Sequence, residues 1–217
     1  LPKTAWPPTL LTGTDIDQGT FKKGMTIILK ESGRLTSIVE ELLDISRIQS
    51  GRMKLMTEKI DLVAELDEAV YMLKERSIQE RKHLMFDSPI EPFPPVMGDK
   101  NRLRQVFLNI IDNALKYTPE GGNVIVQILN KETNIEVLIS DTGCGIAPED
   151  LPKVKDKFYK ANQNVGGSGI GLAVADEIVQ MHGGTLDIES GIGVGTTVKI
   201  SIPVYDESQS KEDKGEN

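Results

Sequence analysis

The sequence changes its apolar period sharply in its second half, and this change constrains the fold more than any other feature. Apolar residues recur at helical spacing after Asp99, a favourable N-cap residue, until Thr118 and Pro119 end the run. A later helical pattern is expected from Gly169 to Met181. Strand-like alternation flanks it in two pairs of segments, residues 123–129 with 135–140 and residues 185–188 with 197–202. This order predicts an α+β fold, a two-layer α/β sandwich with a mixed sheet and helices on one face.

A long helical pattern precedes this unit and predicts a dimerisation helix over residues 15–50. Apolar side chains recur every seven residues at Phe21, Ile28, Leu35 and Leu42, which is typical of helices that pair. A helix of roughly 30 residues spans about 45 Å, which is too long for one small domain to cover. We therefore expect a homodimer through this N-terminal helix.

Turn-forming residues and composition delimit the rest of the chain. Prolines at positions 2, 7 and 8 predict an irregular N-terminal arm over residues 1–14. Mixed helical and strand patterns predict a second domain over residues 57–204. Residues 205–217 are rich in acidic side chains and lack aliphatic ones, which predicts a disordered acidic tail.

The charge balance and the single cysteine disfavour several function classes. The chain has 33 acidic and 25 basic residues, a net charge of −8, which opposes contact with nucleic acid. No apolar stretch is long enough to span a membrane, so we expect a cytoplasmic segment without membrane contact, although a longer protein could be membrane-anchored elsewhere. Cys144 has no partner for an intrachain disulfide, and the absence of a Gly-Lys dipeptide excludes a P-loop.

A column of amides and a strand-end carboxylate point to a binding site. Gln105, Asn109 and Asn113 recur every four residues, so their side chains form a polar column beside the apolar face of the helix. Asp141 follows a strand, and the glycines just after it allow close backbone approach. A carboxylate in this place can accept a hydrogen bond from an exocyclic amine.

Two further glycine clusters extend this pattern. Residues 166–171 run directly into a helix, whose free N–H groups and positive dipole end suit phosphates. Residues 193–197 form a third glycine turn with hydroxyls at the start of a strand. The cluster at 166–171 lacks the third small residue of the dinucleotide fingerprint and directly follows no strand, which disfavours a Rossmann site.

In order and spacing, these segments resemble the ATP-binding catalytic domain of two-component sensor histidine kinases. That domain belongs to the GHKL group, with the Bergerat fold, which includes heat-shock-90, type II topoisomerase and mismatch-repair ATPases. The resemblance covers residues 20–204, and KESGRLTSIVEELLDISRIQSG (30–51) is similar to the second helix of the kinase dimerisation hairpin. The matching boxes are the N box RQVFLNIIDNALKYT (104–118), the first glycine box DTGCG (141–145), the F box KFYKA (157–161), the second glycine box GGSGIGLA (166–173) and the third glycine box GVGTT (193–197).

The resemblance implies a site for ATP with Mg²⁺. Asn109 and Asn113 would hold the metal ion and the phosphates, because amide oxygens are suitable hard ligands. Lys116 and Tyr117 would reach phosphate and ribose, and Asp141 would accept the adenine amine. Gly143 and Gly145 would leave room for the adenine ring, and Thr196 or Thr197 could help to hold it. The implied binding residues of the second glycine box are Gly167, Gly169, Gly171 and Leu172.

The same resemblance implies an ATP lid and a protein partner. The lid would cover residues 146–168, with Phe158 as its anchor and with Lys157 and Lys160 offering charge to the phosphates. The partner would be the receiver domain of a response regulator.

Asn109 and the positions of the two histidines distinguish histidine phosphorylation from ATP hydrolysis and from self-phosphorylation. ATPases of this group carry a glutamate at the position of Asn109, and an amide cannot take a proton from water, which favours histidine phosphorylation over hydrolysis. Neither His83 nor His182 lies in an acceptor-like helix. We therefore expect the catalytic region of a sensor histidine kinase that does not phosphorylate itself. The alternative is a non-transferring nucleotide-binding module that acts in dimerisation or regulation.

Overall fold

The computed structural model describes residues 17–162 and 166–205, and it divides the chain into two compact units, Leu1–Leu43 and Asp44–Asn217. The predicted arm over residues 1–14 lies outside the described residues. So does the predicted tail over residues 205–217, except for Tyr205.

Helix α1 (Gln18–Gln49) is the long helix that the heptad spacing predicts. Its seven-residue stripe is largely uncovered within the chain, because Phe21, Ile28, Leu35 and Leu42 are between 38% and 59% exposed. The last turns differ, since Asp44 and Ile45 are buried in the second unit.

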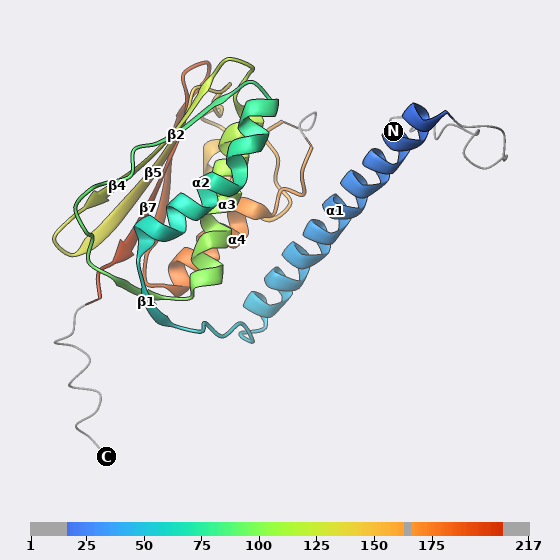
Figure 1. Cartoon of the computed structure of the whole chain (residues 1–217). Helices are drawn as coiled ribbons and strands as arrows, with labels where there is room; N and C mark the ends of the chain where they lie inside the picture. Colours follow the sequence, from blue (N-terminus) through green and yellow to red (C-terminus); the bar gives the residue numbers. More distant parts are fainter. Residues whose placement is uncertain (1–16, 163–165, 206–217) are drawn as a thin grey trace. The chain divides into compact units, whose positions relative to one another are not determined.

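The second unit is built on a five-stranded mixed sheet in the order β2-β4-β5-β7-β6, in which β2 runs parallel to β4 and the other neighbours are antiparallel. Helices α2, α3 and α4 cover one face of this sheet (Figure 1). The predicted two-layer α/β sandwich is therefore confirmed. The bounds are α2 (Leu62–Gln79), β2 (His83–Phe86), α3 (Lys100–Tyr117), β4 (Asn123–Asn130), β5 (Asn134–Asp141), α4 (Gly171–Met181), β6 (Thr185–Gly191) and β7 (Gly195–Pro203).

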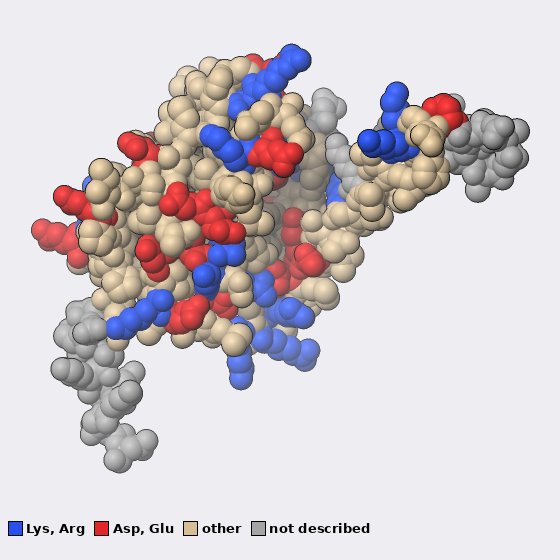
Figure 2. Space-filling model, viewed as in Figure 1, with Lys and Arg blue, Asp and Glu red and all other residues tan. Residues whose placement is uncertain are grey.

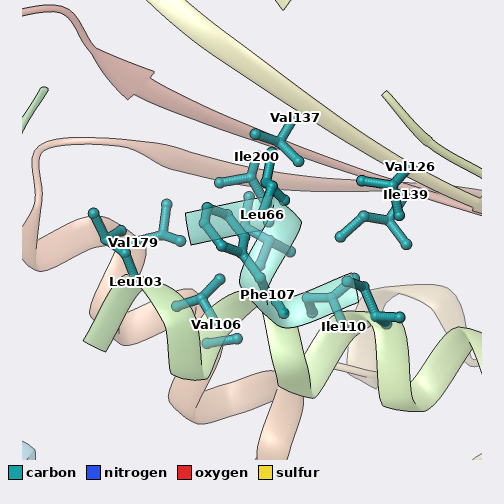
Figure 3. Packing of buried hydrophobic residues seen from close by; sticks show 14 of the residues in the cluster. Leu66, Leu103, Val106, Phe107, Ile110, Val126, Val137, Ile139, Val179 and Ile200 are labelled. Atoms are coloured by element: carbon teal, nitrogen blue, oxygen red, sulfur yellow. The ribbon is translucent and has the colours of Figure 1, made fainter. Parts of the chain in front are cut away.

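The core forms where the inner face of the sheet meets the apolar stripes of the helices. Strand register aligns Val137, Ile200 and Leu186 in one row across β5, β7 and β6, and all three are buried. Figure 3 shows Phe107 of α3 and Leu66 of α2 packed against this sheet. Since side chains alternate along a strand, the intervening residues point to the other face of the sheet.

A second, two-stranded sheet lies at one end of the unit. Strand β1 (Glu58–Ile60) pairs antiparallel with β3 (Val96–Gly98). The extended segments at His83–Phe86 and around Val96 were expected, and residues 52–57 form no helix or strand, as expected of a polar link. Strand β1 was not expected, because a three-residue strand gains its order from a partner far away in the chain rather than from a local pattern.

Asp99 and His182 form a joint between three segments. Asp99 caps α3 as predicted, with Oδ1 accepting from the Asn101 and Arg102 N–H groups (both 3.1 Å) and Oδ2 accepting from the Met56 N–H (2.9 Å). His182 follows α4; its Nε2 accepts from the Asp99 N–H (2.9 Å), and its Nδ1–H donates to the Ile178 carbonyl (2.7 Å). The end of α4 is thereby tied to the start of α3.

A buried carboxylate joins α2 to α3. Glu65 is 4% exposed, and its Oε2 accepts from Nε and Nη2 of Arg104 at 3.0 and 2.7 Å. Lys100 lies 3.2 Å from the other oxygen. The negative charge is thus compensated by two cations from the neighbouring helix.

On each outer strand of the large sheet, a backbone carbonyl accepts a hydrogen bond from a lysine. On β2, the Leu84 carbonyl accepts from Lys74 Nζ of α2 (2.7 Å). On β6, the Leu186 carbonyl accepts from Lys155 Nζ, which also pairs with Asp176 of α4.

Replacing Arg104 with methionine should lower the free energy of unfolding by about 2–4 kcal/mol, because Glu65 stays buried and loses the guanidinium that donates two hydrogen bonds to its Oε2. Urea denaturation followed by circular dichroism measures the change. The control is Arg34→Met on α1, since Arg34 and its partner Glu31 are 54% and 53% exposed. Its effect should stay below about 0.5 kcal/mol. Equal losses in both variants would contradict the structural role of Glu65.

Stability should also fall as the pH drops below about 6.5. Burial lowers the pKa of His182 from 6.5, outweighing the Ile178 carbonyl and the Asp99 charge, which both raise it. The unfolded chain therefore takes up this proton more readily, so the stabilisation is complete above the unfolded pKa and decreases below it. Chemical denaturation at about pH 7.5 and about pH 5.5 tests this expectation. His182→Gln should show a smaller pH dependence than the unmodified chain.

Candidate functional site

Helix α3 places three polar side chains along the border of its buried face. Asn109, Asn113 and Lys116 are half-buried, while their helical neighbours Ile110 and Leu115 are fully covered. The amphipathic pattern of the helix therefore fixes both the core and the edge of the site.

The first amide of the predicted column has another role. Gln105 Nε2 donates to Asp44 Oδ2 (2.9 Å), and its Oε1 accepts from Arg102 Nη1 (2.8 Å), which also donates to Asp44 (2.7 Å). Gln105 is thus part of a buried polar cluster at the end of α1, whereas Asn109 and Asn113 remain available for the site.

Asn109 connects α3 to the second glycine box. Its Nδ2 donates to the Gly171 carbonyl at 3.1 Å, so Oδ1 is left as an acceptor. Gly171 is the first residue of α4, and Ile170 at the N-cap provides no side-chain cap. The first N–H groups of α4 thus have no capping side chain from the N-cap residue, and free N–H groups at a helix start suit an anionic ligand.

The next turns of α3 meet the other glycine boxes. A Cβ on Gly167 would lie 2.5 Å from Lys116 Nζ, and one on Gly143 would lie 2.7 Å from the Tyr117 carbonyl. Burial raises the pKa of Tyr117, and nearby Cys144 raises it further. The structure thus brings predicted site residues from three distant segments together along one helix.

Asp141 ends β5 with one carboxylate oxygen in use. Its Oδ1 accepts from the N–H groups of Gly143 (2.7 Å) and Thr196 (3.3 Å), and among the described residues none donates to Oδ2. Burial raises the pKa of this carboxyl, and the two backbone hydrogen bonds lower it less than burial raises it. A ligand with an N–H donor can therefore satisfy Oδ2.

The structure separates the two candidate threonines. Thr196 pairs in register with Asp141, so it lies on the helix-covered face of the sheet. Thr197 lies on the opposite face, where its hydroxyl is 2.9 Å from that of Ser140. Thr196 is the threonine on the side of the site.

Gly145 and Gly195 are glycines for a reason that sequence alone does not show. A Cβ on Gly145 would lie 1.9 Å from the Gly191 carbonyl oxygen, and one on Gly195 would lie 1.9 Å from the Asp141 carbonyl oxygen. Both have positive φ angles, 70° and 119°. The close approach of the protein's own backbone thus accounts for these two residues.

The predicted lid is held to the domain over much of its described length. Lys157 lies 3.5 Å from Glu177 of α4 and so has an acidic partner within the protein. Phe158 was expected to anchor the lid, but its side chain is 62% exposed and its φ is 69°. The anchor is the backbone, because the Phe158 N–H donates to the Gly169 carbonyl at 2.9 Å. Lys160 packs against Gly169, and residues 163–165 lie outside the described residues.

Sequence reasoning missed Ser190, which contacts both the lid and the third glycine box. Its Oγ accepts from the Ile146 N–H (2.8 Å) and donates to the Gly195 carbonyl (2.9 Å). The alternation of Leu186 and Ile188 along β6 would have placed Ser190 on the inner face, but a lone serine carries no signal of its partners.

The described residues contain no cluster of three or more His, Cys, Asp or Glu side chains that could hold a metal ion, and no helix among them could cross a membrane. On the face that Figure 2 shows, lysines and arginines are interspersed with acidic side chains.

Comparison with known proteins agrees with this geometry. The family model described as "Histidine kinase-, DNA gyrase B-, and HSP90-like ATPase" matches residues 98–206. Histidine protein kinase DivJ of Caulobacter vibrioides is 34% identical over 181 residues, 82% of this chain and 30% of that protein. Sensor protein SrrB of Staphylococcus aureus is 31% identical over 198 residues, 89% of this chain and 34% of that protein. The chain thus spans about a third of the length of these curated relatives.

Solved structures give the same result. A mycobacterial sensor histidine kinase, MprB, is 28% identical with a TM-score of 0.58, covering 69% of this chain and 98% of that one. Histidine kinase AdeS of Acinetobacter baumannii is 25% identical with a TM-score of 0.69, covering 92% and 91%. The chain therefore belongs to the family of histidine kinase-, DNA gyrase B- and HSP90-like ATPases and contains an ATP-binding catalytic region of the sensor histidine kinase type.

Proposed function

We propose that this chain binds Mg²⁺·ATP and transfers the γ-phosphate to a histidine outside these 217 residues, for relay to a response regulator. The observation that carries the proposal is that three successive residues of the site on α3 each contact a different glycine-rich segment. Asn109 meets the start of α4, Lys116 meets Gly167, and Tyr117 meets the turn after Asp141. Phosphate-binding and base-binding groups thus follow one another along one helix.

The amides of α3 fit a magnesium ion that accompanies the phosphates. Asn109 directs Nδ2 to the Gly171 carbonyl and keeps Oδ1 for a ligand, and no described residue hydrogen-bonds the side chain of Asn113. Amide oxygens are suitable ligands for Mg²⁺, which usually keeps several waters and binds substrate phosphates. When bound, the ion would neutralise phosphate charge.

The remaining residues would position the nucleotide. The N–H groups at the start of α4 and Lys116 face the phosphate end, where positive charge favours an anion. Tyr117 would contact the ribose, and Asp141 Oδ2 would accept from the adenine amine. Thr196 would assist Asp141 from the neighbouring strand, and Gly167, Gly169, Gly171 and Leu172 would shape the phosphate end.

Transfer to an imidazole fits this site better than attack by water. The position that would carry a catalytic carboxylate is Asn109, whose amide cannot accept a proton from water. A neutral imidazole needs no such base, because it is already a nucleophile. The domain's task is then to hold ATP in place while another segment brings the histidine.

Neither histidine of the chain suits the acceptor role. His182 is 9% exposed, and both of its ring nitrogens are hydrogen-bonded within the fold. His83 is exposed, but it begins strand β2 of the sheet and so does not lie in a helix like that of a phosphoacceptor. An acceptor supplied by another segment or molecule is consistent with both placements.

The proposed partners follow from α1 and from the family. The exposed seven-residue stripe of α1 supports a homodimer through this helix. ThkA, a kinase that shares the fold at 23% identity and a TM-score of 0.68, was solved with the response regulator TrrA. We assign the same class of partner to this chain, and a cytoplasmic location where ATP is present.

Replacing Asp141 with asparagine should weaken ATP binding by about 1–3 kcal/mol, because the new amide can present a donor to the adenine amine. The fold should keep or gain stability, since burial raises the pKa of Asp141 and an amide can still accept from Gly143 and Thr196. Isothermal calorimetry and thermal melting measure the two effects. The control is Asp187→Asn on β6, whose side chain is 60% exposed. Unchanged ATP affinity in a folded Asp141→Asn variant would remove Asp141 from the site.

The isolated chain should bind ATP without phosphorylating itself, because transfer needs a nucleophile held close to the γ-phosphate and neither His83 nor His182 lies in an acceptor-like helix. Incubation with labelled Mg²⁺·ATP should give no acid-labile, base-stable phosphate. Adding a peptide with the histidine-containing hairpin helix of a related kinase should restore labelling, on the peptide. Binding without any transfer would favour the non-transferring regulatory module, and steady phosphate release would favour an ATPase. A label on His83 or His182 would overturn their assignment as structural residues.

A further inference from the structure

Three polar side chains form one row across the end of the sheet. Asp141 of β5 pairs in register with Thr196 of β7, which pairs in register with Ser190 of β6. The next row inward consists of Ile139, Val198 and Ile188. Because side chains two residues apart on a strand share a face, the polar row continues the apolar rows and ends them at the nucleotide site.

The hydroxyl of Ser190 has every hydrogen-bonding position filled. It accepts from the Ile146 N–H (2.8 Å), donates to the Gly195 carbonyl (2.9 Å) and lies 2.8 Å from Thr196 Oγ1. A carbonyl only accepts, so the single Ser190 proton goes to Gly195. Thr196 must then donate its own proton to Ser190. The proton of Thr196 is thereby directed away from the site.

This arrangement leaves only acceptors at the base end of the site. Thr196 Oγ1 keeps its lone pairs, and Asp141 Oδ2 is a carboxylate oxygen without a donor among the described residues. A base with an exocyclic amine can donate to such a pair. A base with an oxo group in the same place presents another acceptor there and has its only nearby donor at the neighbouring N1–H, so it cannot pair with both groups in the same pose, which is costly.

The same serine also fixes the start of the lid. Ile146 is the first residue of the predicted lid, and its N–H is held by Ser190 Oγ. On the far side of the sheet, Ser140 and Thr197 form a comparable hydroxyl pair, which among the described residues makes no hydrogen bond to the Asp141 side chain or to the lid. The two pairs are one residue apart in register but on opposite faces.

We propose that Ser190 is a specificity-determining positioning residue, which holds Thr196 Oγ1 as an acceptor beside Asp141 and thereby selects a 6-amino purine over a 6-oxo purine. The inference rests on the proposed nucleotide-binding function of the site. Ser190 acts through Thr196 and Ile146 and does not itself contact the base.

The test compares ATP with ITP, which replaces the 6-amine with an oxo group. In Ser190→Ala, the Thr196 proton loses its acceptor and can turn toward the base. ATP affinity should fall about fivefold, ITP affinity should fall less or rise, and the ATP-to-ITP preference should shrink about tenfold by calorimetric competition. Ser140→Ala is the matched control and should leave this preference unchanged. Ser190→Thr keeps the hydroxyl and should restore most of the preference.

Thr196→Val removes the hydroxyl from the other side of the pair. It should shrink the preference to a similar extent, and adding Ser190→Ala should change it little further. This variant also tests the inference if Ser190→Ala does not fold. An unchanged preference in the folded variants, or an equal loss in Ser140→Ala, would overturn the role of Ser190 while leaving ATP binding intact. Failure of the unmodified chain to bind ATP would instead overturn the proposed function and this inference together.

Discussion

The antiparallel pairing of β5 with β7 is the constraint on which the catalytic unit depends. It runs in register from Asn134 with Pro203 to Asp141 with Thr196, and it joins segments that the lid and α4 separate in the chain. A slip of one residue would turn the apolar rows outward and replace Thr196 with a neighbour on the wrong face. The same register positions the side chains of the core and those of the site. A change that disturbs this register would therefore disrupt core packing and base recognition together.

The elements that sequence reasoning predicts well are those with local causes. Helix α3 was predicted from its apolar period and from the Asp99 cap, and both signals lie within the helix or next to it. The mixed sheet and its helical layer followed from the order of the patterns and are confirmed. Strand β1 was missed because three residues are too few for a period, and its partner β3 lies far along the chain. The link from His182 to Asp99 depends on a similar long-range contact.

The residue types of the site were predicted from the sequence, but the contacts that these residues make with segments far away in the chain were not. Gln105 shares the spacing of Asn109 and Asn113, yet a buried carboxylate at the end of α1 takes its amide. Lys157 was expected near phosphate, and a glutamate of α4 pairs with it. The choice between two adjacent threonines depends on strand parity, which is readable once the register is known. In each case the deciding partner lies more than ten residues away in the sequence.

The lysines on β2 and β6 have a consequence for how copies of this protein can meet. An outer strand usually presents a row of unpaired backbone groups on which a foreign strand can build. Here the Leu84 and Leu186 carbonyls already bind lysine ammonium groups, which occupy both edges of the sheet, and the ammonium on β6 is also paired with Asp176. Growth of the sheet from one molecule into the next would have to displace these ammonium groups and bury their charge. Intermolecular strand addition, the first step toward fibrillar aggregates, is therefore opposed at both edges of the sheet.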